Sequence, residues 1–372
     1  MANILILYQF ILIFAKVSKY SISTDMSEFD QRDDEISRLG EFGLIDRLTR
    51  DIRIVNESTC KGVGDDAAVL DYGRSRVVVT TDLLAEGIHF NLMYTPLKHL
   101  GYKAAVVNFS DIYAMNAIPR QLLISMAISR KFTISMMDTI YSGIRLACSQ
   151  YGVDLVGGDT TSSLTGLVIS CTAIGEGKEA ELTYRNGAGM NDLICVSGDL
   201  GGAYMGLQLL ERERLLFEKN HDIQPVLEGY DYVLERQLKP EARRDITELL
   251  RKKGIKPTSM IDISDGLSSE TMHICKASDK GCRIWADKIP IHPETIRVAR
   301  EFDMDPLIAA LNGGEDYELL FTIPVGSFEL IRKMSEISVI GHVADISEGK
   351  KMVISGGGEV TLEAQGWNPL DH

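Results

Sequence analysis

Residues 153–160 read Val-Asp-Leu-Val-Gly-Gly-Asp-Thr, an apolar segment that runs directly into two glycines, an aspartate and a hydroxyl residue. Aliphatic and β-branched side chains favour a strand, and glycine lets the backbone come close to a bound group. The segment therefore predicts a buried strand over 153–156 that presents Asp159 at its carboxyl end, with 167–174 as its hairpin neighbour. Four other segments also place aspartate at the end of an apolar run, beside glycine or hydroxyl residues: Gly64-Asp65-Asp66-Ala67, Thr80-Thr81-Asp82, Asn108-Phe109-Ser110-Asp111 and Asp262-Ile263-Ser264-Asp265-Gly266.

The aspartates of these five segments predict a site for divalent cations. Seven carboxylates at one cleft would repel one another strongly unless cations neutralised them. A set of hard oxygen ligands without cysteine or histidine favours Mg²⁺ over zinc. The sequence contains neither a G-x-x-x-x-G-K-S/T loop nor the H-R-D and D-F-G motifs, which excludes P-loop enzymes and protein kinases. The segments thus indicate magnesium-dependent chemistry on phosphate groups.

Each segment also has a simpler interpretation when it is taken alone. Gly64-Asp65-Asp66 would serve as a solvated turn, and Asp111 would be one half of a salt bridge between helices. The glycine turn 198–202 resembles a dinucleotide loop only loosely, and we interpret it as a tight turn before a helix. Acidic turns that arose by accident would not fall repeatedly at the ends of predicted strands and helices. The joint pattern therefore favours the cation site.

Composition limits the class of protein. The length of 372 residues predicts two domains, and 45% hydrophobic with 25% charged residues provides for a sizeable core. The net charge of −14, without a compensating basic run, argues against a nucleic-acid surface, so anionic nucleotides would have to bind through cations. The six cysteines are scattered, without a C-x-x-C pair, which predicts reduced thiols in a cytoplasmic protein.

Strand and helix patterns alternate along the chain and predict an α/β protein with mixed, α+β-type sheets. The expected strands are 67–70, 77–79, 121–127, 192–197, 260–263 and 318–323. The expected helices are 35–48, 97–115, 134–150 and 266–277, with two more that begin at Ala203 and at Lys239-Pro240-Glu241. The glycine-rich stretch 185–191 predicts a boundary between an N-terminal domain over 31–184 and a C-terminal domain over 185–372.

The first residues are unlike the rest of the chain. Ile4 to Ala15 form an apolar run that is short for a membrane span and lacks both a preceding basic segment and an A-x-A cleavage site. A polar stretch that opens at Met26 has the character of a natural start. We therefore expect residues 1–30 to be a non-native or mis-assigned leader rather than a membrane anchor.

The five segments in this order, followed by Gly313-Gly314-Glu315-Asp316-Tyr317-Glu318-Leu319, resemble the thiamine-monophosphate kinase family, within the superfamily of aminoimidazole ribonucleotide synthetase. The resemblance extends from Gly40 to about Pro369. It implies a two-domain aminoimidazole ribonucleotide synthetase-like fold, in which the N-terminal domain forms a barrel with its twin in a homodimer. A C-terminal α/β domain would complete the cleft. The implied partners are ATP and thiamine monophosphate, with several Mg²⁺ ions as cofactors and with no nucleic acid or membrane.

The resemblance implies three groups of site residues by their position in the motifs. The implied metal ligands are Asp65, Thr80, Thr81, Asp82, Asp111, Asp159, Asp262 and Asp265. The implied ATP contacts are Asp65, Tyr141, Gly158, Asp159, Arg185 and Ser264. The implied contacts to thiamine monophosphate are His89, Glu315 and Trp367, where an aromatic ring can stack on the cationic thiazolium and a carboxylate can offset its charge. Each assignment has a structural alternative. Trp367 would be a packing residue, His89 an ordinary histidine at a strand end, and Arg185 a partner in a salt bridge at the domain boundary.

The implied reaction is phosphoryl transfer from ATP to thiamine monophosphate, which gives thiamine diphosphate and ADP. The acceptor oxygen belongs to a phosphate whose second pKa is about 6, so we expect direct in-line transfer without a general base. A synthetase of the aminoimidazole ribonucleotide type, a magnesium-dependent phosphatase and a non-catalytic nucleotide-binding protein are the alternatives. Selenophosphate synthetase is disfavoured because Cys60 lacks glycine-rich surroundings, and a hydrogenase-maturation relative because Leu370-Asp371-His372 contains no cysteine.

One residue departs from the family pattern. Asn116 stands where the family usually has glycine after Asp111 and its helix. Asparagine tolerates a left-handed backbone better than most residues do, so we expect the turn to persist.

Overall fold

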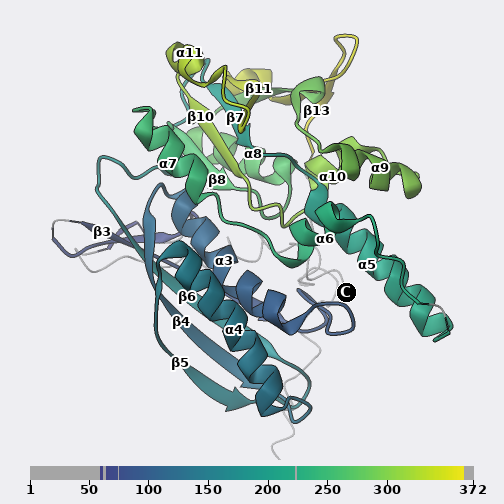
Figure 1. Ribbon diagram of the computed structural model, residues 1–372. Helices are drawn as coiled ribbons and strands as arrows, with labels where there is room; N and C mark the ends of the chain where they lie inside the picture. Colours follow the sequence, from purple (N-terminus) through teal and green to yellow (C-terminus); the bar gives the residue numbers. More distant parts are fainter. Residues whose placement is uncertain (1–58, 62–63, 74, 223, 364–372) are drawn as a thin grey trace, which may run out of the picture. The chain divides into compact units, whose positions relative to one another are not determined.

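The computed structural model describes residues 59–61, 64–73, 75–222 and 224–363 (Figure 1). The expected leader over 1–30, the expected helix over 35–48 and Trp367 lie outside the described residues.

The first half of the described chain builds a sheet with two helices packed against it. Its six described strands follow the order β1-β2-β3-β6-β4-β5. All neighbours pair antiparallel except β4 and β5, which are parallel. The helices α3 and α4 contribute the largest buried side chains of this core, among them Tyr102, Phe109 and Ile144. The strands are β1 Thr59–Lys61, β2 Ala68–Asp71, β3 Arg76–Ala85, β4 Ile118–Ile128, β5 Asp154–Ser162 and β6 Val168–Gly177, and the helices are α3 Leu97–Ala114 and α4 Ile134–Tyr151.

Three expectations for this sheet were wrong. The strand expected to be buried over 153–156 is the exposed edge strand β5, in which the side chain of Val156 is 55% exposed. A short apolar run does not reveal what covers it, which explains the error. The expected hairpin of 167–174 with this strand does not form, because β6 pairs with β3 and β4 instead. Asp82 does not follow a strand but lies in the middle of β3.

The second half builds another mixed sheet, with seven described strands in the order β13-β12-β9-β11-β7-β10-β8. Strands β7, β10 and β8 are almost wholly buried, and their aliphatic side chains pack against the helices of this half. The strands are β7 Leu193–Ser197, β8 Ser259–Asp262, β9 Gly281–Trp285, β10 Leu319–Ile323, β11 Ile337–Ala344, β12 Lys350–Val353 and β13 Glu359–Thr361. The helices are α5 Gly202–Lys219, α6 Asp231–Leu238, α7 Arg244–Lys252, α8 Leu267–Ser278, α9 Pro293–Glu301, α10 Pro306–Asn312 and α11 Phe328–Ile331.

Most of the remaining expected elements are confirmed within a few residues. An exception is the helix expected to start at Lys239-Pro240-Glu241, since α7 begins only at Arg244. The Glu241 carboxylate accepts hydrogen bonds from the hydroxyls of Tyr102 (2.6 Å) and Tyr151 (2.7 Å), which hold this stretch as a connection against α3 and α4. The glycine turn 198–202 is a tight turn before a helix, with Gly201 at φ +81° as the N-cap of α5.

The turn after α3 persists as expected. Asn116 has φ +53°, and its side-chain amide donates to the Glu181 carbonyl at 2.8 Å. The predicted domain boundary falls in the connection between β6 and β7, and the domain limits stay a prediction. Within the described ranges, no helix combines the length and the apolar character that crossing a membrane requires.

Candidate functional site

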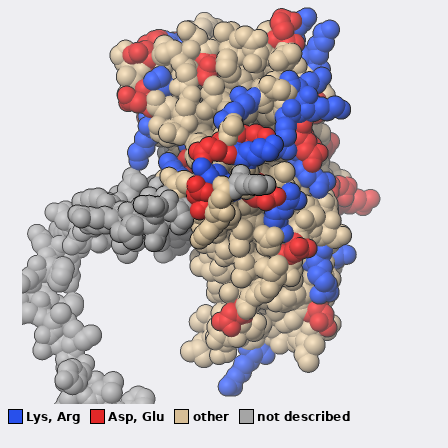
Figure 2. Space-filling view, turned by 90° about the vertical axis from the view of Figure 1, so that its left-hand side faces the viewer, with Lys and Arg blue, Asp and Glu red and all other residues tan. Residues whose placement is uncertain are grey.

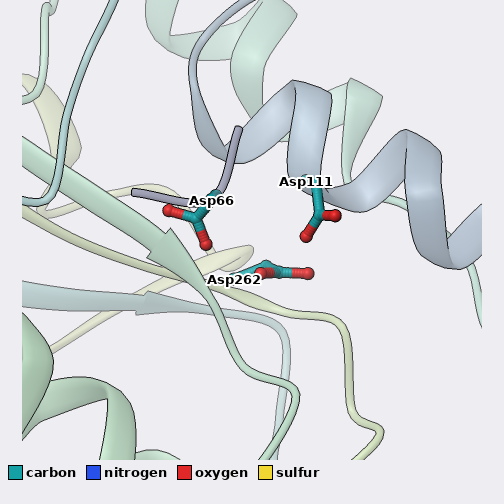
Figure 3. Close-up of side chains that lie close together, drawn as sticks. All are labelled: Asp66, Asp111 and Asp262. Atoms are coloured by element: carbon teal, nitrogen blue, oxygen red, sulfur yellow. The ribbon is translucent and has the colours of Figure 1, made fainter. Parts of the chain in front are cut away.

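Three aspartates from distant parts of the sequence meet at one point (Figure 3). Asp66 comes from the turn before β2, Asp111 from α3 and Asp262 from the end of β8. One carboxylate oxygen of each lies within 4.8 Å of the others. The first half of the described chain thus supplies two of these carboxylates, and the second sheet supplies the third.

Burial makes this cluster electrostatically unfavourable for the protein alone. Burial, followed by the charges of Asp82 and Asp262, raises the pKa of Asp111 well above its ordinary value. Burial and the charge of Asp66 raise the pKa of Asp262 to about 8. Burial raises the pKa of Asp82, on the neighbouring strand β3, to about 6. Carboxylates that burial and mutual repulsion keep from ionising fit a divalent cation that accepts hard oxygen ligands.

Hydroxyl groups orient two of the three carboxylates. Thr80 Oγ1 donates to Asp111 Oδ2 at 2.6 Å, and Ser110 Oγ donates to Asp262 Oδ2 at 2.5 Å. The second bond connects α3 with the end of β8. Successive residues of a strand point to opposite faces. Thr81 accordingly turns away from the cluster, and its hydroxyl donates to the Cys171 carbonyl of β6 at 2.8 Å.

The two adjacent aspartates before β2 have different surroundings. Arg185 makes a two-pronged ion pair with Asp66, with Nε–Oδ2 at 3.0 Å and Nη2–Oδ1 at 2.9 Å. Asp65 instead accepts the backbone N–H of Arg185 and lies 3.5 Å from Lys61 Nζ. Burial and the charge of Asp66 raise the pKa of Asp65. Asp66, and not Asp65, is therefore the member of the three-carboxylate cluster, and the salt bridge considered for Arg185 does form.

A side chain of the following helix, α8, holds the turn after β8. Glu270, buried on α8, accepts the backbone N–H of Asp265 at 2.9 Å and that of Ser264 at 3.3 Å. Burial raises the pKa of Glu270 well above its ordinary value. These two N–H groups thus have an acceptor within the protein.

The residues expected on β5 and α4 lie outside the three-carboxylate cluster. Asp159 is exposed on the edge strand β5. Position 158 must be glycine, because a Cβ there would lie 1.7 Å from the carbonyl oxygen of Ile124 on the neighbouring strand β4. Tyr141 is half-buried on α4 and packs against the core of the first half.

A second polar cluster surrounds Glu315. Lys103 Nζ of α3 lies 2.8 Å from Glu315 Oε1, and the Gln237 amide of α6 donates to Glu315 Oε2 at 2.7 Å. His89 lies within electrostatic reach: burial lowers the pKa of its imidazole, the charge of Glu315 raises it and Lys103 lowers it again. His89 Nδ1 accepts the backbone N–H of Ala85 at 3.0 Å. The charge of Glu315 thus acts on the His89 imidazole, and both residues are among the three that the resemblance assigns to thiamine monophosphate.

Charges from both clusters act on Tyr317, the tyrosine of the Gly313–Leu319 motif. Tyr317 is half-buried against the first core. Burial raises the pKa of Tyr317, and the charges of Glu315 and of the aspartates at 82, 262 and 111 raise it further. Its ring therefore lies within electrostatic reach of both the Glu315 cluster and the three-carboxylate cluster.

The residue-by-residue assignments from the sequence omitted several residues that the structure places in these clusters or beside them: Asp66, Lys103, Gln237, Glu270 and Tyr317. A signal existed for two of them. Asp66 stands beside Asp65 in an acidic pair, and Lys103 is a charged residue in the apolar middle of a helix. A lysine at such a position needs a buried partner.

Comparison with known proteins identifies the class first. The model of the family described as AIR synthase related protein, N-terminal domain, matches residues 64–176. This stretch contains the turn of Asp66, strand β3 and helix α3. The solved structure described as AaThiL complexed with AMPPCP and TMP superposes with a TM-score of 0.77 and 30% identity, covering 90% of this chain and 98% of that one. The chain therefore has the mixed α/β fold of the AIR synthase-like class.

Relatives then identify the particular family. The thiamine-monophosphate kinase of Aquifex aeolicus is 33% identical over 333 residues, which cover 89% of this chain and 98% of that relative. The enzyme of the same name from Bacillus subtilis is 32% identical over 337 residues, covering 89% and 99%. The chain belongs to the thiamine-monophosphate kinase family.

Proposed function

We propose that the protein phosphorylates thiamine monophosphate to thiamine diphosphate with ATP as the phosphoryl donor. The observation that carries the proposal is the cluster of Asp66, Asp111 and Asp262, formed from three separate elements, in which Asp262 is buried and the other two residues are half-buried. The names of the relatives and the AMPPCP and TMP of the similar solved structure support the choice of substrates. The aspartate-rich segments of the sequence led to the same reaction.

The three carboxylates fit Mg²⁺ by their chemistry, since each offers a hard oxygen at a shared point. Mg²⁺ held by Asp66, Asp111 and Asp262 would neutralise charge on the phosphates and so lower the repulsion between donor and acceptor. The protein orients the carboxylates of Asp111 and Asp262 through the hydroxyls of Thr80 and Ser110 before a ligand arrives. Such orientation contributes to rate because it needs no rearrangement during the reaction.

The transfer requires no protein base. A phosphate monoester has a second pKa of about 6, so its oxygen is largely deprotonated at neutral pH. Burial keeps protons on the carboxylates near Asp262, which disfavours them as bases in the absence of a cation. We propose direct in-line transfer without a phosphoenzyme, and isolation of a phosphorylated protein intermediate would contradict it.

The remaining site assignments are part of this proposal. Arg185 can exchange its ion pair with Asp66 for a nucleotide phosphate, since guanidinium binds carboxylate and phosphate in the same two-pronged geometry. Glu315 and His89 form the acceptor end of the site. Asp65, Asp82, Asp159 and Asp265 are proposed as further metal ligands and Tyr141, Gly158 and Ser264 as further ATP contacts. Trp367, beyond the described residues, is proposed as an acceptor contact on the resemblance alone.

We propose a homodimer through the first sheet. Strand β5 is the edge of that sheet and is exposed along its whole length, including Leu155 and Val156. An exposed apolar edge favours pairing with another chain. A cytoplasmic location is proposed from the six cysteines, which are all free within the structure. On the face shown in Figure 2, acidic and basic side chains lie beside one another, which is typical of a solvent-exposed surface.

An ADP-release assay tests the function. The purified protein is given Mg²⁺ and ATP with thiamine monophosphate, free thiamine or aminoimidazole ribonucleotide precursors, side by side. We expect ADP only with thiamine monophosphate, with thiamine diphosphate formed in equal amount. ADP formation without an acceptor would indicate a phosphatase, and ADP with the precursors a synthetase. No ADP with any acceptor, despite nucleotide binding, would indicate a non-catalytic protein.

A further inference from the structure

We propose that Lys103 is a positioning residue for the acceptor substrate: through Glu315 it sets the affinity for thiamine monophosphate without contacting the nucleotide. The proposal rests on the function given above. It starts from the position of Lys103 in the middle of α3, where its residue is only 4% exposed. A lysine buried in this way must be paired, and its partners show what it holds in place.

Lys103 connects three segments that are far apart in the sequence. Its Nζ lies 2.8 Å from Glu315 Oε1 and donates to the Gln237 carbonyl at 3.2 Å. The Gln237 side chain in turn donates to Glu315 Oε2 at 2.7 Å. Each carboxylate oxygen of Glu315 thus has its own donor, and the plane of the carboxylate is fixed.

The backbone of Glu315 is fixed as well. Glu315 and Tyr317 both have a left-handed backbone, with φ of +67° and +52°, which non-glycine residues adopt at a cost. Between them, Asp316 accepts the N–H groups of Gly201 (2.7 Å) and Ala203 (3.3 Å) at the start of α5. The N–H of Glu315 donates to the Ser264 carbonyl at 2.8 Å, which attaches this loop to the turn after β8. A strained residue held from several sides is typical of a functional site.

Lys103 lies away from the three-carboxylate cluster. It precedes Asp111 by two helical turns, a separation of about 12 Å along α3. The side chain of Glu315 is 27% exposed, whereas that of Lys103 is only 5% exposed. Glu315 can therefore contact an acceptor whose phosphate is at the cluster, and Lys103 acts through Glu315.

The test measures thiamine monophosphate binding and turnover in Lys103→Met. Calorimetry in Mg²⁺ and AMPPCP should show binding weakened at least 10-fold, and the KM for thiamine monophosphate should rise by a similar factor. The KM for ATP should stay within about 3-fold. Lys98→Met, an exposed lysine on the same helix, is the matched control and should leave both constants unchanged.

A double-mutant cycle decides whether Lys103 acts through Glu315. Glu315→Gln alone should weaken acceptor binding, and the double variant should bind no more weakly than Glu315→Gln does. Additive losses would overturn the proposal, as would equal rises in both KM values or unchanged acceptor binding in Lys103→Met.

Two further comparisons distinguish failure of this inference from a folding defect and from failure of the proposed function. Lys103→Gln, which keeps a donor for the Gln237 carbonyl, carries the same prediction where Lys103→Met does not fold. Failure of both variants to fold would overturn the proposal, because stabilising the fold would then account for Lys103. If the wild-type protein does not phosphorylate thiamine monophosphate, both the proposed function and this inference are wrong. An active wild-type protein with unaffected Lys103 variants removes the inference alone.

Discussion

Substitution Asp262→Asn should stabilise the metal-free protein while it abolishes activity. Asp262 is 3% exposed, and burial with the charge of Asp66 raises its pKa from 3.8 to about 8. Asparagine has nearly the same shape and still accepts the hydrogen bond from Ser110. The variant therefore removes the unfavourable charge and keeps the contact.

The magnitude follows from the shift. Each pKa unit corresponds to about 1.4 kcal/mol, so a shift of this size sets an upper bound of about 6 kcal/mol. The repulsion is shared with Asp66 and Asp111, and the favourable charge of Arg185 is lost with the carboxylate. We therefore expect the free energy of unfolding at pH 8 to rise by about 2 kcal/mol in the variant.

The sign of the pH dependence is also set. Because the folded pKa of Asp262 is raised, folded protein holds a proton that unfolded protein has released between pH 4 and 8. The free energy of unfolding of the wild type should thus fall as pH rises, by up to about 1.4 kcal/mol per unit for this group. Asp262→Asn lacks this dependence, so its advantage should narrow as pH is lowered from 8 to 6.

Guanidinium denaturation at pH 6, 7 and 8 measures the free energy of unfolding of the wild type and of Asp262→Asn. Each protein is measured once in EDTA and once in Mg²⁺ with AMPPCP. In Mg²⁺ and nucleotide the order should reverse, because ligand binding stabilises only the wild type. Asp279→Asn, an exposed aspartate with a left-handed backbone that asparagine tolerates, is the control and should change little. A variant that is less stable than wild type in EDTA at pH 8, or an advantage equal at pH 6 and 8, would refute the reasoning.

Further predictions concern the same site. Asp111→Asn and Asp265→Asn should each lower turnover by roughly 100-fold or more while the free energy of unfolding changes far less; near-normal turnover would contradict their role. Gly314→Ala would place a Cβ 2.3 Å from the Ser264 carbonyl oxygen and should cost about 1–3 kcal/mol in denaturation, whereas Gly326→Ala, with nothing within 4 Å, should not. Mg²⁺ affinity, measured by calorimetry, should rise from pH 6 to 8 with release of protons; a flat profile would show that the carboxylates are already ionised.

The local elements were predictable because their signals are local. The helix patterns expected over 97–115 and 134–150 coincide with α3 and α4, and Thr133, whose hydroxyl accepts the N–H of Met136, is the N-cap of α4. The partners of β5 were not predictable, because an apolar strand pairs equally well with either neighbour and carries no mark of the sheet edge. Which strands are adjacent is decided by the packing of the whole sheet.

The site was predictable as a set of segments and not as a set of contacts. The order of the aspartate segments identified the family, and three of the seven aspartates do meet. The sequence did not distinguish Asp65 from Asp66, because the two are adjacent and the backbone direction in one turn decides which carboxylate lies in the cluster. Lys103 was overlooked because its partners, Gln237 and Glu315, follow it by more than a hundred residues.

The electrostatic repulsion within the carboxylate cluster also favours the binding of a cation. Arg185 pairs with Asp66, and its charge also favours the ionised form of Asp262, whereas the hydrogen bonds to the carboxylates of Asp111 and Asp262 come from hydroxyl groups. Full ionisation therefore leaves an excess of negative charge in a buried space, and the raised pKa values of Asp111 and Asp262 measure the resulting resistance. A divalent cation removes that resistance and leaves positive charge available to a polyphosphate. An acidic protein of net charge −14 can in this way bind ATP, because its own repulsion favours the cations that ATP needs.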